Sequence, residues 1–447
     1  TGSYTNMRRF IKLGQLPPAQ SVRAEEYINY FDYKYESSSD KPFAVTYEIA
    51  KSPYNVNRHI VRFGLKSKEA DTLGDKGWNL IFLVDVSGSM MSQNKLPLVQ
   101  QSLKLIVEKM RPQDKISLVT YAGSDRVVLE PTDGSEKSKI KNAIDELSAG
   151  GSTNGSGGIE RAYELAKKAF ITDSVNRVIL ATDGDFNVGR VSFDDLIKMI
   201  EEKRKTGITL TAVGVGEGNL NEKMLEQLSN KGNGNYFYLD SFREARRVFS
   251  EQLTANMTVV AKDVKLQVEF NPAKVRRYKL IGFDNRVLAK EDFKDDKVDA
   301  GEIGSGHTVT ALYEVELVGS PENSDEDLRY QTKDVETAKT EKDLFPNEMG
   351  FLKIRFKKPN SDTSELVEYP LSVPSSESVL NGSGSEDFRF ANAVAGFAEV
   401  LRDKSSAKEI TLDKVLELAK GSKGEDSSGK RTEFIELVED AKRITGE

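Results

Sequence analysis

The chain has 447 residues, 30% charged and 38% hydrophobic, and its 71 acidic and 64 basic side chains leave a net charge of −7. This length predicts two to four domains, and the acidic balance argues against a nucleic-acid partner. Because the chain has no cysteine, disulfides, zinc thiolate sites, iron–sulfur clusters and thiol catalysis are excluded.

No targeting or membrane segment is recognisable in the sequence. No apolar run approaches the roughly 18 residues of a membrane-spanning helix. The chain opens with Thr1-Gly2-Ser3, without an initiator methionine or a signal peptide. We therefore expect a processed or trimmed fragment whose targeting segment is not part of this sequence.

The N-terminal region predicts helices followed by a strand pair. Residues 1 to 45 have a helical pattern that Pro17-Pro18 interrupts, and Glu25-Glu26 favours the start of a second helix. Residues 43–65 change to alternating apolar positions, which predicts a β-hairpin. Two strands are not stable alone, so we expect this hairpin to join a sheet formed later in the chain.

Between Gly77 and Met257 strands and helices alternate. Strands are predicted at 79–85, 115–122, 126–130, 177–182, 208–215 and 235–239. Helices are predicted near 96–110, 137–147, 157–170, 193–205, 221–230 and 241–256. The alternation is typical of an α/β, doubly wound, mostly parallel six-stranded sheet. Gly123-Ser124-Asp125 joins two of these strands in a short hairpin, which indicates one antiparallel edge strand.

The rest of the chain predicts a β-sandwich and then helices. Residues 259 to about 373 are all-β in pattern, with a charged stretch from Pro321 to Asp343 predicted as a mobile loop or hairpin tip. Helical patterns follow at 388–401, 411–419 and 431–443. We expect the α/β domain to be inserted in the sandwich.

The predicted domains are a helical cap (1–45), strands joining the sandwich (46–76), the α/β domain (77–257), the β-sandwich (258–375) and a C-terminal helical segment (385–447).

The stretch IFLVDVSGSM, residues 81–90, is the strongest functional signal. A buried strand ends at Asp85, and Ser87 and Ser89 follow at alternate positions on a tight loop. These side chains offer oxygen ligands only, which suits a hard divalent cation, above all Mg²⁺, with Mn²⁺ and Ca²⁺ as alternatives. One carboxylate and two hydroxyls leave such an ion under-neutralised, so a further carboxylate is expected.

Two later segments supply further oxygen ligands. Gly150-Gly151-Ser152-Thr153 is a glycine-rich turn with a hydroxyl at Thr153, and a second buried strand ends at Thr182-Asp183. The carboxyl ends of strands in an open α/β sheet converge on the edge where ligands bind. Asp85, Ser87, Ser89, Thr153 and Asp183 can therefore meet at that edge. Helix caps and turns would explain any one of these residues, but less readily all five.

The motifs DVSGS, GGST and ATDG, in this order, resemble the metal-ion-dependent adhesion site of von Willebrand factor type A (VWA) domains, which have a Rossmann-like fold. The resemblance implies that Asp85, Ser87, Ser89, Thr153 and Asp183 are the metal ligands, directly or through water. Flanking segments such as TGSYTNMRRF and FDNRVLAKEDF are similar to bacterial VWA proteins of the inter-alpha-trypsin-inhibitor heavy-chain-like group. With these segments the resemblance covers nearly the whole chain.

The resemblance implies a non-enzymatic adhesion or protein-interaction module. Its held cation would bind an acidic residue, Asp or Glu, of a protein partner, and no small-molecule substrate is predicted. The location it implies is extracytoplasmic, periplasmic or at the cell surface. Such domains couple occupancy of the site to movement of their last helix, here residues 242–257.

Other functions have weaker support. A metal-assisted hydrolase, or a subunit of one, would use the same ion to activate water and needs a general base, for which no strong candidate is present. His307 follows a glycine turn, but no nucleophile motif accompanies it. No phosphate-binding lysine loop is present, and Gly214 to Gly218 is better interpreted as a turn. A structural envelope scaffold with an inactive site is the remaining alternative.

Overall fold

The structure is a computed structural model. It describes residues 1–38, 41–69, 77–151, 155–184, 192–217, 220–253, 259–283, 293, 301–320, 345–358, 361, 363–403 and 409–446. The chain divides into two compact units. The α/β unit comprises residues 1–9, 69–260 and 302–306, and the sandwich unit comprises 10–68, 261–301 and 307–447. No helix in the described ranges is long and apolar enough to cross a membrane.

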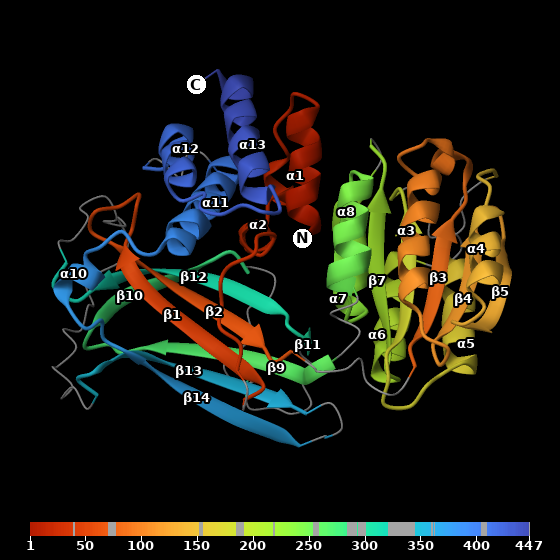
Figure 1. The fold of residues 1–447 in the computed structure, drawn as a ribbon, viewed down its shortest axis with the longest axis horizontal. Coiled ribbons are helices and arrows are strands. Elements are labelled where there is room, and N and C mark those ends of the chain that lie inside the picture. Colours follow the sequence, from red (N-terminus) through yellow and green to blue (C-terminus); the bar gives the residue numbers. More distant parts are fainter. Residues whose placement is uncertain are drawn as a thin grey trace. The chain divides into compact units, whose positions relative to one another are not determined.

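A six-stranded sheet forms the centre of the α/β unit (Figure 1). Its strands are β3 (Asn79–Asp85), β4 (Lys115–Tyr121), β5 (Asp125–Asp133), β6 (Asn176–Thr182), β7 (Ile208–Val215) and β8 (Tyr236–Leu239), in the order β5-β4-β3-β6-β7-β8. Every neighbouring pair is parallel except β4 and β5, which are antiparallel. The predicted doubly wound sheet with one antiparallel edge strand is confirmed.

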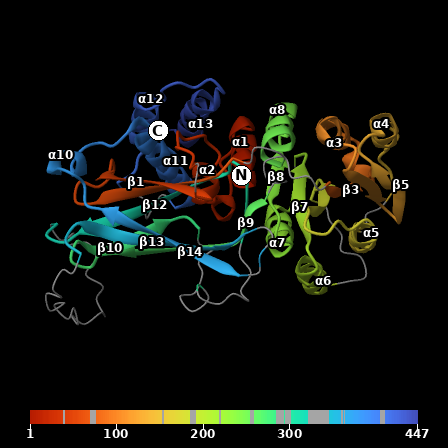
Figure 2. The ribbon, with the colours of Figure 1, turned by 60° about the horizontal axis from the view of Figure 1, so that its bottom comes forward.

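Helices cover both faces of this sheet. They are α3 (Leu96–Lys109), α4 (Lys137–Asp145), α5 (Gly155–Lys168), α6 (Phe193–Lys205), α7 (Glu222–Lys231) and α8 (Phe242–Arg246), which continues as the π-helical segment η3 (Arg247–Gln252). Figure 2 shows α3, α4 and α8 on one face and α5 and α6 on the other. The last helix was predicted to reach residue 257, and residues 254–258 lie outside the described ranges.

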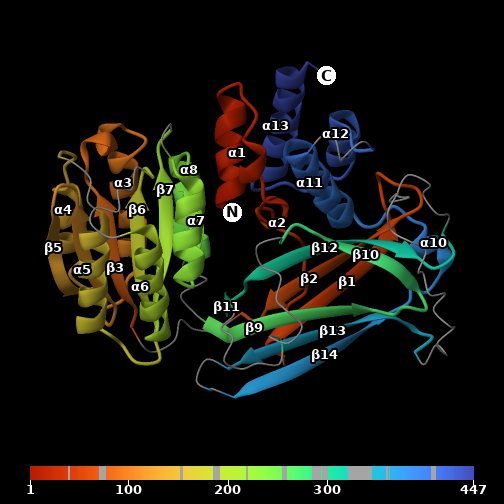
Figure 3. The ribbon, with the colours of Figure 1, turned by 180° about the vertical axis from the view of Figure 1, so that it is seen from behind.

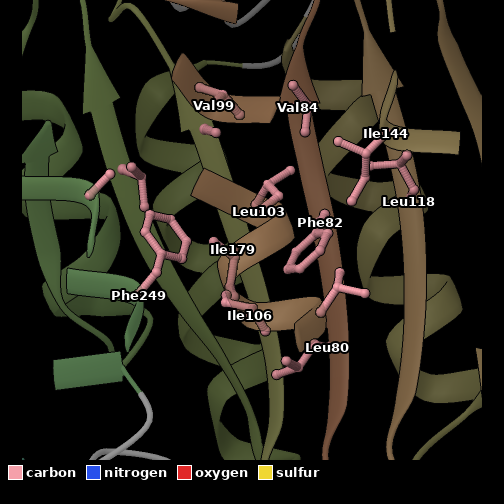
Figure 4. Packing of buried hydrophobic residues seen from close by; sticks show 14 of the residues in the cluster. Leu80, Phe82, Val84, Val99, Leu103, Ile106, Leu118, Ile144, Ile179 and Phe249 are labelled. Carbon is pink, nitrogen blue, oxygen red and sulfur yellow. The ribbon is translucent and has the colours of Figure 1, made fainter. Parts of the chain in front are cut away.

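Strand β3 is buried on both faces, which explains its unbroken apolar run. Alternate side chains of a strand point to opposite faces, so Leu80, Phe82 and Val84 join one core and Ile81 and Leu83 the other. Figure 4 shows the first of these cores, where β3 packs against Leu103 and Ile106 of α3. Because the strand is held on both sides, its carboxyl end is a rigid support for the loop that follows.

The first nine residues pack within the α/β unit although they lie far from it in sequence. They include most of α1 (Gly2–Lys12). The Arg8 guanidinium donates to both carboxylate oxygens of Asp240, at 2.6 and 2.7 Å, and to Glu244 at 3.1 Å. Gly2 lies against the Tyr236 ring, where a Cβ atom would come within 2.2 Å of the ring carbon. These contacts attach α1 to β8 and α8.

The strands of the sandwich unit lie in two four-stranded sheets (Figure 3), and strand residues 259–260 and 302–304 of these sheets are assigned to the α/β unit. One has the order β1-β2-β12-β10, from Phe43–Lys51, His59–Ser67, Thr308–Leu317 and Val275–Ile281. The other has the order β11-β9-β13-β14, from Gly301–Gly304, Val259–Phe270, Glu348–Lys357 and Ser364–Ser372. The inner faces meet where Phe43 lies edge-on to Phe356, with ring centroids 5.2 Å apart. Strand β2 pairs with β12, so the predicted joining of the early hairpin to later strands is confirmed.

Two helices of the sandwich unit, α11 (Glu386–Arg402) and α13 (Lys430–Thr445), meet in an aromatic cluster. The further helices of the unit are η1 (Ala19–Ser21), α2 (Ala24–Ile28), α10 (Glu377–Leu380) and α12 (Leu412–Gly421). Phe434 of α13 packs edge-on against Phe31, Phe390 and Phe397. The sequence did not predict α10 or β11. The charged stretch from Pro321 to Asp343 lies outside the described residues.

Replacing Thr411 by alanine is expected to destabilise the C-terminal helices by about 1 kcal/mol. Thr411 caps α12, and its side-chain oxygen accepts a hydrogen bond from the Lys414 amide at 3.2 Å. Chemical denaturation followed by far-UV circular dichroism would measure the loss. Thr411→Ser keeps the capping oxygen and serves as the control, so equal losses in both variants would contradict a capping role.

Candidate metal site

The candidate site lies at the carboxyl edge of the α/β sheet, where β3 and β6 end side by side. These strands pair in parallel, with Val84 opposite Ala181. Asp85 is the last residue of β3, and Asp183 directly follows the last residue of β6. Two carboxylates far apart in sequence are thereby brought to the same edge, as the sequence predicts.

The Asp85 carboxylate is fully buried and held from three sides. One oxygen accepts from the Ser87 amide at 2.9 Å, and the other accepts from Thr182 Oγ1 at 2.9 Å and Tyr121 Oη at 3.3 Å. Burial raises the pKa of Asp85, and the hydrogen bonds from Ser87 and Thr182 oppose that effect. An ionised carboxylate in a buried position is energetically costly unless a positive charge lies close to it.

The two serines follow Asp85 on a short turn. Ser87 is buried and precedes η2 (Gly88–Met91), whereas Ser89 is exposed. Their hydroxyl oxygens are 3.0 Å apart, so both point to the same place. Because Asp85 and Ser87 are buried and Ser89 is not, the site opens to solvent at Ser89.

Asp183 is buried beside a lysine that the sequence analysis did not single out. Lys95 Nζ lies 2.8 Å from Asp183 Oδ2 and also donates to the Ser89 carbonyl at 2.9 Å. Gly184 turns the chain away from β6 with a φ of +85°, and its amide donates to Thr182 Oγ1. A side chain at Gly184 would also meet the Asn221 backbone nitrogen at 2.5 Å. Any larger residue in place of the glycine of the ATDG motif would therefore clash with the neighbouring backbone.

The glycine-rich turn lies directly against the serine loop. The Gly150 amide donates to the Val86 carbonyl at 2.7 Å, and the Gly88 amide donates to the Gly151 carbonyl at 3.1 Å. The predicted ligand Thr153 follows this turn but lies outside the described residues. Four of the five predicted ligands are thus described, on two adjacent strand ends, and Thr153 stays a prediction.

The described donor set fits a hard divalent cation. Asp85, Ser87, Ser89 and Asp183 present oxygen atoms only, from two carboxylates and two hydroxyls. Sequence reasoning missed Tyr121, Thr182 and Lys95. Thr182 could have been noticed beside Asp183, but no sequence signal marks Tyr121 or Lys95.

The two histidines lie in the other unit. His59 is buried in β2 opposite Lys51, and burial lowers its pKa. His307 immediately precedes β12. Neither belongs to the unit that carries the candidate site.

Three family models match the chain. The model described as von Willebrand factor type A domain matches residues 79–251, which contain the whole six-stranded sheet. A model described as von Willebrand factor matches residues 1–62, and one described as "Uncharacterized protein YfbK, C-terminal" matches residues 255–444. The sheet and these matches define a VWA-domain protein.

Relatives and a solved structure extend this likeness over the whole chain. The protein YfbK of Escherichia coli K12 is 43% identical over 453 residues, covering 100% of this chain and 77% of its own. Inter-alpha-trypsin inhibitor heavy chain H2 of Sus scrofa is 26% identical, over 40% of this chain and 19% of its own. A von Willebrand factor type A structure from Catenulispora acidiphila has a TM-score of 0.50 at 18% identity, covering 86% of this chain and 88% of its own.

The chain therefore belongs to the family of bacterial VWA proteins that includes YfbK, and the predicted relation to the inter-alpha-trypsin-inhibitor heavy-chain-like group is confirmed. VWA domains generally serve as non-enzymatic modules for adhesion and protein interaction, and this chain carries one.

Proposed function

We propose that the α/β unit binds a divalent cation, Mg²⁺ first, through Asp85, Ser87, Ser89, Thr153 and Asp183, and through it an acidic side chain of a protein partner. The observation that carries this proposal is the buried Asp85 carboxylate beside the facing Ser87 and Ser89 hydroxyls, with Asp183 at the end of the adjacent strand. When bound, the cation supplies a concentrated positive charge for a carboxylate ligand.

The site residues have distinct parts in this function. Asp85, fixed by Thr182 and Tyr121, supplies negative charge at a position that cannot shift. Ser89, the exposed member, marks the side from which a partner can approach. The surrounding burial lowers the effective dielectric constant, so a charge–charge contact there is stronger than at an open surface.

We propose an interaction role for this module and not an enzymatic one. A hydrolase would need a general base within hydrogen-bond reach of the reacting water. The two histidines of the chain belong to the sandwich unit, whereas the proposed ligands belong to the α/β unit.

Calorimetric titration of Mg²⁺, Mn²⁺ and Ca²⁺ into metal-stripped protein tests the proposal. We expect saturable binding at one site, weakened at least 100-fold in Asp85→Ala because the buried carboxylate is lost. Asp145→Ala removes an exposed carboxylate of α4 whose ion-pair partner is Lys104 of α3, and should bind like the unchanged protein. Equal metal affinity in the unchanged protein and in Asp85→Ala would refute the metal site.

A peptide-binding assay tests the chemical class of the partner. Metal-loaded protein should bind immobilised peptides that carry glutamate or aspartate, and should release them on chelation. Matched peptides with glutamine or asparagine should not bind. Equal binding of acidic and amide peptides would contradict recognition of a carboxylate.

A further inference from the structure

Among the described residues of the candidate site, Lys95 stands out because its positive charge opposes a metal ion. Its ammonium lies 2.8 Å from Asp183 Oδ2, and the two side chains are only 14% and 2% exposed. It therefore places a positive charge on a carboxylate predicted to hold a cation. This inference rests on the proposed function, since it concerns how the same site acquires its metal.

The position of Lys95 in the fold is unfavourable for a lysine unless its side chain has a dedicated partner. It is the N-cap residue of α3 and makes no side-chain capping bond. Serine, threonine, aspartate and asparagine are preferred there, and the positive end of the helix dipole disfavours a cation. The contact with Asp183 offsets this cost.

The neighbouring strand end leaves room for the lysine stem. Gly216 follows β7 with a φ of +77°, and a Cβ atom built on it would come within 2.5 Å of Lys95 Cε. The stem thus runs across the glycine toward Asp183. The ammonium at the end of the stem also donates to the Ser89 carbonyl. Lys95 therefore connects the loop that carries Ser89 with the loop that carries Asp183, and both loops are predicted to hold the metal.

We propose that Lys95 is a tethered cation that competes with the divalent metal for Asp183 and so lowers the metal affinity of the site. A monovalent and a divalent cation sharing one buried carboxylate repel each other strongly. Metal binding then requires the ammonium to move away from Asp183. An incoming acidic ligand favours that movement, because it supplies negative charge to both cations.

Calorimetry on the metal-stripped full chain tests this role, with Mn²⁺ and Mg²⁺ as probes. Lys95→Met keeps the stem and removes the charge, and we expect it to bind metal at least tenfold more tightly than the unchanged protein. Lys95→Arg retains the charge and should not gain affinity. Lys104→Met removes a charge from the same helix, where Lys104 pairs with Asp145, and should leave the affinity unchanged.

The outcomes separate this inference from the proposed function. Metal binding in Lys95→Met alone would support both. Equal or weaker binding in Lys95→Met than in a metal-binding unchanged protein would overturn the competition and leave the metal site standing. Absence of binding in both proteins would overturn both proposals.

A measurement without metal gives an independent check. In chelator, Lys95→Met and Asp183→Asn should each lower the midpoint of thermal unfolding, and the double variant should lower it by less than the sum. Such non-additivity is expected of two groups in direct contact. Strictly additive shifts would overturn the pairing, and Lys95→Gln provides a second variant if Lys95→Met does not fold.

Discussion

Replacement of Glu244 by glutamine is expected to lower the free energy of unfolding of the α/β unit by about 3 kcal/mol. The Glu244 side chain is 2% exposed and accepts from Arg247 on one oxygen and from Arg8 on the other. An amide in its place turns a donor toward one of these guanidinium groups. The positive charge of that guanidinium group is then buried without an opposing negative charge, which destabilises the folded state.

This loss can be observed selectively. Trp78 is the single tryptophan of the chain and is buried in the α/β unit, so its fluorescence during urea unfolding follows that unit. Glu201→Gln is the matched control, because Glu201 forms an ion pair with Lys231 in which the side chains are 33% and 51% exposed. Exposed pairs contribute roughly 0–1 kcal/mol. Similar losses in both variants would contradict the importance of the buried network.

The same residue predicts a dependence on pH. Burial alone would raise the pKa of Glu244, but the charges of Arg247 and Arg8 outweigh burial and lower it. Its contribution to stability is therefore complete above the ordinary glutamate pKa and is lost as the pH falls through the lowered value. Between neutral pH and strongly acidic solution, the unchanged protein should lose more stability than Glu244→Gln. Parallel pH profiles would contradict this.

Replacement of Asp85 by asparagine is expected to separate metal binding from stability. The metal affinity should fall at least 100-fold, because an amide is a weaker ligand than a carboxylate for a hard cation. In chelator, however, the variant should be at least as stable as the unchanged protein. Burial raises the pKa of Asp85, so the ionised carboxylate is held at a cost that the amide avoids.

Thermal unfolding in chelator and in excess Mg²⁺ would measure both effects. Metal that binds only the native state should stabilise the unchanged protein by about 2.7 kcal/mol at 100 times its dissociation constant. Asp85→Asn should show no such increase, and Asp145→Asn should show the full increase. A large loss of stability in metal-free Asp85→Asn would mean that the carboxylate is structural.

The sequence predicted those parts of the fold that depend on long, regular patterns. The buried runs of β3 and β6 and the residues that end them place Asp85 and Asp183 correctly, because parallel strands share one carboxyl edge. Four-residue elements such as α10 and β11 have too few positions for a period to appear.

The parts of the site that were missed depend on three-dimensional packing. Tyr121 reaches Asp85 from the adjacent strand β4, and Lys95 reaches Asp183 across Gly216, the residue after β7. Nothing in their local sequence distinguishes them from other tyrosines and lysines. Helix α1 and its Arg8 contacts are a similar case, since no local pattern predicts that the first residues pack on β8 and α8.

The pairing of β2 with β12 has a consequence during protein synthesis. Lys66 lies opposite Thr308, so about 240 residues must be translated before β2 meets its second neighbour. At 5–20 residues per second this takes roughly 12–50 seconds. During that interval the nascent β1–β2 hairpin has an open edge, while residues 79–239, which carry the whole six-stranded sheet, are made and can fold. The sheet of the α/β unit is thus expected to fold first on the ribosome, and the open edge of the hairpin is expected to need protection until β12 is made.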